Sequence, residues 1–181
     1  MPSIANIPAG RDIPRDFNVI IEIPAEGGEI KYEIDKDSGL LMVDRFMATA
    51  MRYPCNYGFV PGTLALDGDP ADVLVLTPAP IQPGAIIRVR PIGLLQMTDE
   101  AGEDSKILAV PIEKLCQRSV QIQELNDVPH VFLEKISHFF EHYKALEPNK
   151  WVKIVGWQPR EAAEAELLAS VARYDQQSSA E

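Results

Sequence analysis

The stretch Phe17-Asn18-Val19-Ile20-Ile21-Glu22-Ile23 is rich in β-branched residues and alternates apolar with polar positions at both ends. Two more alternating runs follow, Glu29–Ile34 and Leu40–Phe46, and short glycine-containing segments separate the three runs. This pattern predicts three strands in an antiparallel meander.

The rest of the chain adds strands first and helices later. Residues 72–76, 86–97, 106–110 and 151–155 are further strand candidates, and prolines mark the loops between them. Apolar residues at helical spacing predict one helix after Pro129 and another after Pro159. The fold class is therefore α+β, a barrel-like sheet closed by helices. We expect a single domain over residues 1–174 and a disordered tail over 175–181, which has no apolar anchor.

Composition restricts the functional classes. The formal net charge is -10, which disfavours a nucleic-acid partner, although divalent cations can reverse the local sign of an acidic pocket. The two cysteines, Cys55 and Cys116, have no paired spacing and indicate thiols of a reducing compartment. No apolar segment approaches the roughly 20 residues of a membrane span, so no membrane partner and a cytoplasmic location are expected.

An aspartate loop, residues 67–72, is the sharpest chemical feature. Asp67-Gly68-Asp69-Pro70-Ala71-Asp72 places three carboxylates just before an apolar strand. Such a group repels itself unless a cation is present, and its hard oxygen donors suit Mg²⁺ or Ca²⁺. The alternative is a solvated acidic turn.

A second acidic segment, Thr98–Asp104, lies between two strand-like runs and resembles a hairpin tip. A four-residue turn over 100–103 would place Asp99 and Asp104 opposite each other. Asp104 and Lys106 are two residues apart, so in an extended chain they point the same way. This would pair a metal ligand with a phosphate-binding cation, and the alternative is an ordinary charged hairpin tip.

Basic side chains on the predicted strands supply the opposite charge. Lys31 and Glu33 share the polar face of one strand, and Arg45 lies on an otherwise apolar strand face, where it needs a partner or a pocket. Each of these residues, taken alone, is compatible with a purely structural role.

Together these segments make the chain resemble the bacterial type of soluble family I inorganic pyrophosphatase over nearly its whole length. The resemblance rests on residues 20–24, 30–35, 43–47, 53–58, 66–70 with Asp72, 97–104, 138–144 and 151–153. One departure is Ala71, where the family usually has a larger aliphatic residue; it removes no ligand.

The resemblance implies an OB-like five-stranded antiparallel β-barrel with flanking α-helices, a homohexamer, a pyrophosphate substrate and several Mg²⁺ ions, with Mn²⁺ or Zn²⁺ as possible substitutes. It implies that Asp69 is the general base that, with two metals, activates the attacking water. The implied metal ligands are Asp67, Asp72, Asp99, Asp104 and Glu33. The implied substrate-binding set is Lys31, Arg45, Tyr57, Lys106, Tyr143 and Lys144; Lys31, Arg45 and Tyr57 are also catalytic, and Glu22 and Tyr53 lie close behind.

Three rival hypotheses remain. His138-Phe-Phe-Glu-His142 fits the H-x-x-E-H pattern of some zinc proteases, but only 39 residues follow it, and the resemblance instead suggests a subunit interface for both histidines. The aspartate loop could belong to a calcium-binding or OB-type interaction module without catalysis, which predicts acidic and basic groups on different faces. Asp67-x-Asp69 could also be an aspartyl-phosphatase motif, but the βα alternation of that fold is missing.

Overall fold

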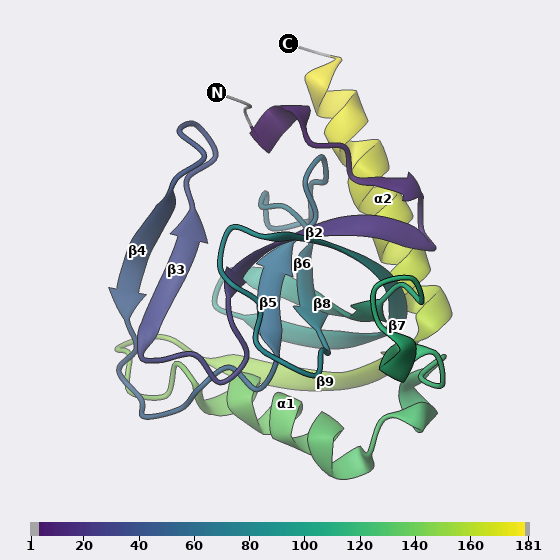
Figure 1. Cartoon of the computed structure of the whole chain (residues 1–181). Coiled ribbons are helices and arrows are strands. Elements are labelled where there is room, and N and C mark those ends of the chain that lie inside the picture. Colours follow the sequence, from purple (N-terminus) through teal and green to yellow (C-terminus); the bar gives the residue numbers. More distant parts are fainter. Residues whose placement is uncertain (1–3, 180–181) are drawn as a thin grey trace.

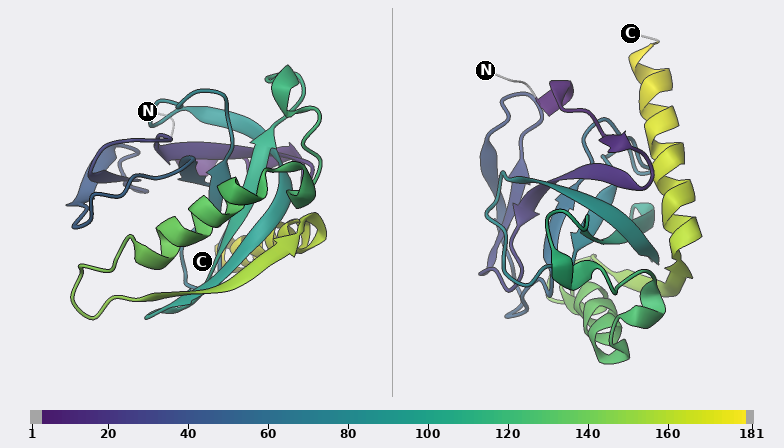
Figure 2. Two further views of the ribbon diagram at one scale, coloured as in Figure 1. Left: turned by 90° about the horizontal axis from the view of Figure 1, so that it is seen from below. Right: turned by 45° about the vertical axis from the view of Figure 1, so that its right-hand side comes forward.

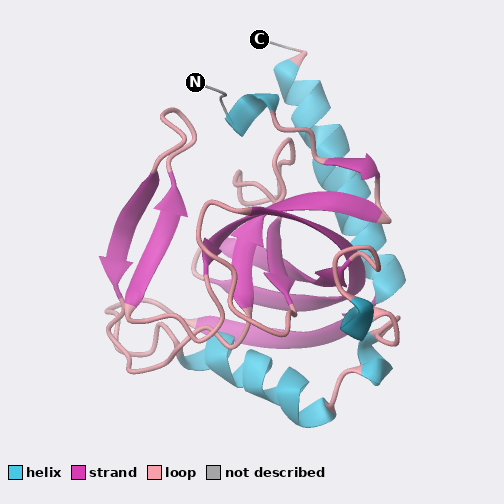
Figure 3. Cartoon of the chain, viewed as in Figure 1, coloured by secondary structure: helices cyan, strands magenta, loops and turns pink. Residues whose placement is uncertain are grey.

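The computed structural model describes residues 4–179 as a mixed α+β fold, mostly sheet with two α-helices (Figures 1 and 3). Five of its strands pair into a closed ring, because β7 bonds to both β8 and β2. In ring order these strands are β2 (Asp16–Ile23), β5 (Asn56–Phe59), β6 (Asp72–Val75), β8 (Gly102–Pro111) and β7 (Ile86–Asp99).

The ring is not purely antiparallel, contrary to the prediction. Strands β6 and β8 run parallel, with Asp72 opposite Lys106 and Val75 opposite Ala109. A parallel pair needs a long crossover, and β7 lies between the two strands in sequence and provides it. The parallel register brings Asp72 and Lys106 side by side.

The predicted meander of the first three strands is also wrong. Both edges of β2 are taken by β5 and β7, so β3 (Ile30–Ile34) and β4 (Leu41–Phe46) form a separate two-stranded sheet. This β3–β4 hairpin stands beside the ring (Figure 1). The two remaining strands extend the main sheet: β1 (Gly10–Asp12) pairs with β2, and β9 (Val152–Pro159) pairs with β7.

Strand β5 was missed because its sequence, Asn-Tyr-Gly-Phe, reads as a loop. Gly58 is required there, because a Cβ atom at this position would lie 2.0 Å from the carbonyl oxygen of Ile20 on β2. The glycine allows the two backbones to approach closely at the point where Tyr57 enters the interior.

Two helices cover the sheet on different sides (Figure 2). Helix α1 (His130–His142) packs Ile136, Phe139 and Phe140 into a core cluster with Leu74 and Leu95 of the ring. Helix α2 (Arg160–Ser178) buries Ala163 and Leu167 in a second cluster. Full burial of one such large apolar side chain contributes roughly 1.5–3 kcal/mol, so α1 is firmly attached. The short 3-10 helices are η1 (Ile4–Asn6), η2 (Gln117–Ser119) and η3 (Leu125–Asp127).

The tail differs from expectation. Residues 175–178 continue α2 as regular helix, whereas the sequence predicted a disordered tail over 175–181. Residues 180 and 181 lie outside the described part of the chain.

Candidate active site

One cavity of about 370 Å³, on the side of the ring next to the β3–β4 hairpin, collects every side chain that the sequence singled out as a catalytic, substrate, metal or supporting residue. They come from strands β2 to β8, the segment before β5, the aspartate loop and the C-terminal end of α1. The candidates lining it are Glu22, Lys31, Glu33, Arg45, Tyr53, Tyr57, Asp67, Asp69, Asp72, Asp99, Asp104, Lys106, Tyr143 and Lys144.

The aspartate loop is held in a tight turn by its own hydrogen bonds. The amide of Asp69 donates to Asp67 Oδ1 at 3.0 Å, and the amide of Ala65 donates to the Asp69 carbonyl at 2.7 Å. Gly68 has φ +92°, which permits the turn. Asp67 and Asp69 therefore face the cavity from its rim, while Asp72 enters it from the start of β6.

Lys106 is the buried cation at the centre of the site. Its Nζ atom lies 2.6 Å from Asp72 Oδ2 and 2.6 Å from Asp104 Oδ1, as their positions on the parallel strands and the two-residue spacing favour. Burial alone would lower the pKa of Lys106, but the two carboxylates outweigh it and raise that pKa well above its usual value. This ammonium therefore stays charged.

The hairpin tip is tighter than predicted. Asp99 pairs with Gly102 across a two-residue turn, and Asp104 pairs with Met97, so the two aspartates are not opposite each other. Asp99 instead accepts a 2.8 Å hydrogen bond from Lys144 Nζ, which connects the tip to the segment after α1.

The β3–β4 hairpin contributes a second group of mixed charge. Lys31 Nζ lies 2.9 Å from Glu33 Oε1, which confirms that the two side chains share a face. The sequence analysis expected a partner or a pocket for Arg45, and the structure gives it a partner: Arg45 Nη1 lies 2.6 Å from Glu147 Oε2. The neighbouring Asp44 accepts from Arg45 Nε at 2.9 Å.

Glu22 is the buried acid of the cavity. Burial raises its pKa to about 8, the nearby Asp72 and Glu33 add to that rise, and the amide of Ile34, which donates to Glu22 Oε1 at 2.8 Å, opposes it. The same hydrogen bond connects β2 to the end of β3, so Glu22 also fixes the position of the hairpin.

Two tyrosines form the aromatic floor. Tyr53 packs against Phe139 with ring centroids 4.6 Å apart, and Tyr57 lies next to it at 5.3 Å. The Lys106 ammonium is 5.7 Å from the Tyr57 ring centroid, within the range of a cation–π contact. Burial raises the pKa of both phenols well above the usual value, so both hydroxyls remain protonated and can donate hydrogen bonds.

Comparison with known proteins agrees with this site. The family model for inorganic pyrophosphatase matches residues 19–175. The chain belongs to the inorganic pyrophosphatase family. It is 60% identical to the inorganic pyrophosphatase of Escherichia coli K12 over 171 residues, covering 94% of this chain and 97% of that protein.

Solved structures show the same fold. The inorganic pyrophosphatase of Coxiella burnetii superposes with a TM-score of 0.91 at 63% identity, covering 93% of this chain and 99% of that one. The enzyme from Thermus thermophilus gives a TM-score of 0.91 at 45% identity, covering 96% and 99%.

This pyrophosphatase-family cavity holds three further charged residues that the sequence did not identify. Lys36 Nζ lies 2.8 Å from Asp69 Oδ1, and Lys150 Nζ lies 2.7 Å from Glu100 Oε1. Lys36 comes from the loop between β3 and β4, and Lys150 precedes β9, so each reaches the cavity only through the fold. Glu100 had a signal, because it lies inside the acidic segment 98–104.

The donor set fits hard divalent cations. Eight carboxylates and six Lys or Arg side chains line the cavity, so acid remains in excess. Burial raises the pKa of Asp67, and Asp72 and Asp104 add to it, which marks negative charge that a cation would stabilise. Within residues 4–179, no three acidic, histidine or cysteine side chains converge on a single point, and Lys106 lies between Asp72 and Asp104. Coordination by three aspartates therefore requires their side chains to turn.

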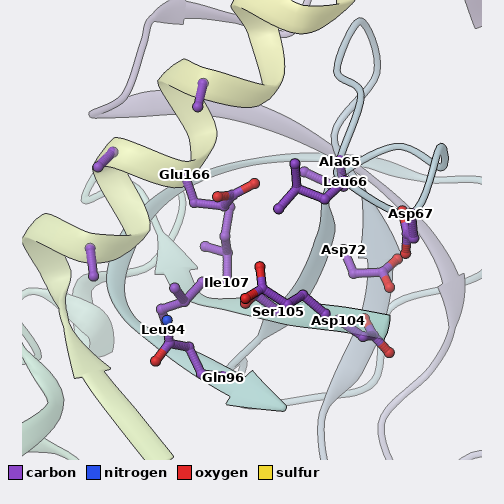
Figure 4. Close-up of a pocket in the computed structure, with 15 residues that line it drawn as sticks. Ala65, Leu66, Asp67, Asp72, Leu94, Gln96, Asp104, Ser105, Ile107 and Glu166 are labelled. Carbon is purple, nitrogen blue, oxygen red and sulfur yellow. The ribbon is translucent and has the colours of Figure 1, made fainter. Parts of the chain in front are cut away.

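A second cavity of about 400 Å³ lies behind the aspartate loop, next to α2 (Figure 4). Asp67, Asp72 and Asp104 line both cavities, and in Figure 4 they lie on the side away from Glu166 of α2. Ala71 is 3% exposed and lines this back cavity, so its small side chain packs behind the aspartate loop.

The rival hypotheses lose their support. Acidic and basic groups share one cavity, which disfavours a module that only binds calcium. His138 and His142 stack with ring centroids 4.3 Å apart on the exposed side of α1, outside this cavity. The family match excludes the protease and aspartyl-phosphatase readings. Among the described residues, no helix is long and apolar enough to span a membrane.

Proposed function

We propose that this chain hydrolyses pyrophosphate to two orthophosphates. The observation that carries the proposal is Lys106, a buried ammonium shared by Asp72 and Asp104 in a cavity where both charges are abundant. Pyrophosphate hydrolysis needs such a mixture, because cations must neutralise the substrate while a carboxylate receives a proton from water.

We infer that Asp67, Asp72, Asp99, Asp104 and Glu33 hold several Mg²⁺ ions, for which Mn²⁺ or Zn²⁺ can substitute. When bound, these ions would supply charge neutralisation and lower the pKa of water towards about 7. Glu22 and Tyr53 support this arrangement from behind: Glu22 accepts the amide of Ile34, and Tyr53 packs on Phe139.

We assign Asp69 as the general base that accepts a proton from the attacking water. Its carboxylate is on the rim, 2.8 Å from the Lys36 ammonium, and it is free to accept a proton once that pair opens. The side chains assigned to hold phosphoryl oxygens are Lys31, Arg45, Tyr57, Lys106, Tyr143 and Lys144. Phosphoryl transfer is catalysed mainly by positioning the substrate and stabilising its negative charge, and these groups can do both.

Several features of the whole molecule belong to the same proposal. We assign the closed ring to an OB-like barrel and residues 1–174 to one domain. We propose a homohexamer in the cytoplasm, with His138 and His142 near a subunit interface and no nucleic-acid partner.

A phosphate-release assay with pyrophosphate tests the function. We expect rapid release with Mg²⁺ and little release with a chelator. The Lys144→Met variant should be much slower, while Lys135→Met, which removes an exposed lysine paired with Glu26, should match the wild type. No release with any divalent metal would overturn the proposal.

A further inference from the structure

Three arginines from different elements meet at the start of α2. Arg15 lies in the turn between β1 and β2, Arg90 on β7, and Arg160 is the first residue of α2. All three line a cavity of about 310 Å³ that has no residue in common with the candidate active site. Arg90 and Asp99 are nine residues apart on β7, so the two sites are separated by roughly 30 Å along the strand.

This cavity is locally positive in an acidic protein. Glu164 is the carboxylate among its lining residues, against three guanidinium groups, whereas the whole chain has a net charge of -10. Burial lowers the pKa of Arg90, the nearby carboxylate of Glu113 opposes this shift, and the charge of Arg160 adds to it. An anion placed between these arginines would relieve their mutual repulsion.

Arg160 has a donor without an acceptor. Among the described residues, its Nε atom is the buried side-chain polar atom that has no hydrogen-bond partner. Two carboxylates lie too far from this guanidinium for hydrogen bonds, although the charges attract: Glu164 Oε1 is 3.7 Å from Nε, and Glu161 Oε1 is 3.6 Å from Nη2. A buried donor without an acceptor costs free energy, because it has lost its hydrogen bond to water. An acceptor from a bound ligand would remove this cost.

The end of the helix adds to the attraction. Helix α2 has 19 residues, and Pro159 at its N-cap makes no side-chain cap. The first backbone N–H groups of a helix lack partners inside it, and the helix dipole favours negative charge at that end. Arg90 Nη2 donates to the Ser119 carbonyl at 2.8 Å, which fixes its guanidinium near this helix end.

We propose that the Arg15–Arg90–Arg160 cavity, as we name it, is a binding site for a phosphate group, separate from the active site. Arginine forks match phosphate oxygens in pairs, and within residues 4–179 neither Arg15 nor Arg90 has a carboxylate within 4.0 Å, so both guanidinium groups are free to pair with an anion. The phosphate could be free orthophosphate or the 5′-phosphate of a small nucleotide, which share this chemistry.

Titration calorimetry on metal-free protein tests the site without relying on catalysis. The probes are inorganic phosphate and adenosine monophosphate. We expect both to bind the wild type, and each of Arg15→Gln and Arg160→Gln to weaken binding roughly tenfold, the value of one charge-assisted contact. The control is Arg11→Gln, because Arg11 is an exposed arginine of β1 that does not line the cavity.

The outcomes separate the possibilities. Tighter binding of adenosine monophosphate identifies a nucleotide as the ligand, and equal binding identifies free phosphate. All variants should keep the wild-type rate of Mg²⁺-dependent pyrophosphate hydrolysis, which verifies that they fold. Absence of binding at millimolar phosphate, or equal weakening in Arg11→Gln, would overturn the proposal even if hydrolysis is normal.

Discussion

Asp72 and Lys106 are direct cross-strand partners in the parallel pair β6–β8, and their side chains meet at 2.6 Å. Asp104 completes the contact at the same distance, and the Lys106 side chain is 4% exposed. The Lys106 ammonium therefore neutralises two carboxylates that are largely shielded from water and that we propose as metal ligands. Stability and metal binding are coupled at this point, because both depend on what neutralises Asp72 and Asp104.

The Lys106→Met substitution should destabilise the metal-free protein. Removing one partner of a buried ion pair typically costs about 3–5 kcal/mol, because the remaining charges lose compensation. Mg²⁺ should restore more stability to this variant than to the wild type. Urea unfolding with and without chelator measures both effects.

Lys135→Met is the matched control for that experiment. Lys135 pairs with Glu26 at 2.7 Å, but both side chains are 55% exposed, and exposed pairs contribute about 0–1 kcal/mol. Equal losses of stability in the two variants would contradict the role given to Lys106.

Glu22 makes stability depend on pH. Its folded pKa of about 8 lies above the unfolded value near 4.5, so the folded state holds the proton more tightly. The stabilisation is complete below pH 4.5 and is lost as pH rises towards 8. Over that window the loss is on the order of 5 kcal/mol.

The Glu22→Gln variant should lack that pH dependence, because an amide does not titrate and its oxygen can still accept the Ile34 amide. Urea unfolding of metal-free protein at several pH values between 5 and 8 gives the difference between variant and wild type. A difference that stays constant across this range would show that Glu22 ionises normally.

Much of the fold was predictable because local pattern and burial agree. Residues 17–23 alternate at both ends and residues 73–75 are continuously apolar, and both stretches lie in ring strands. Strand pairing was less predictable, because it depends on which edges of β2 are free, and nothing local to β3 reveals that β5 and β7 occupy them.

The residues of the site also divide into those that local sequence spacing predicts and those that only the fold brings together. Asp104 and Lys106 were placed correctly because a spacing of two in a strand fixes a common face. The contact between Lys36 and Asp69 joins two loops 33 residues apart and could only come from the fold. The family resemblance supplied the roles, which spacing alone could not assign.

The two stacked histidines of α1 should make assembly sensitive to acid. His138 and His142 are exposed on the chain, and we place them at a subunit contact, where protonation of both rings would add like charges. Sedimentation velocity should show an oligomer at neutral pH and smaller species at pH 5. The His138→Gln/His142→Gln double variant should dissociate less in acid, and a wild-type monomer at neutral pH would contradict the interface.

Asp69 and Asp72, two aspartates of the aspartate loop, should have different roles that mutation can separate. Asp72 lies inside the cavity against Lys106, whereas Asp69 is on the rim with a side chain 72% exposed. Asp72→Asn should weaken metal affinity and rate together, because a ligand loses its charge. Asp69→Asn should lower turnover by ~10² to 10⁴ with a smaller effect on metal binding, as expected for loss of a general base.

Calorimetric metal titration beside steady-state kinetics distinguishes these roles for Asp69 and Asp72. Both residues lie near the same proposed ions, so the double variant should lose less than the sum of the single losses in activation free energy. Lys36 allows an internal check, because it contacts Asp69 and is no assigned ligand. Lys36→Met should change turnover in the wild type but not in the Asp69→Asn background, where the carboxylate it contacts is gone. Equal losses of metal affinity in Asp69→Asn and Asp72→Asn would show that the base has been assigned to the wrong residue.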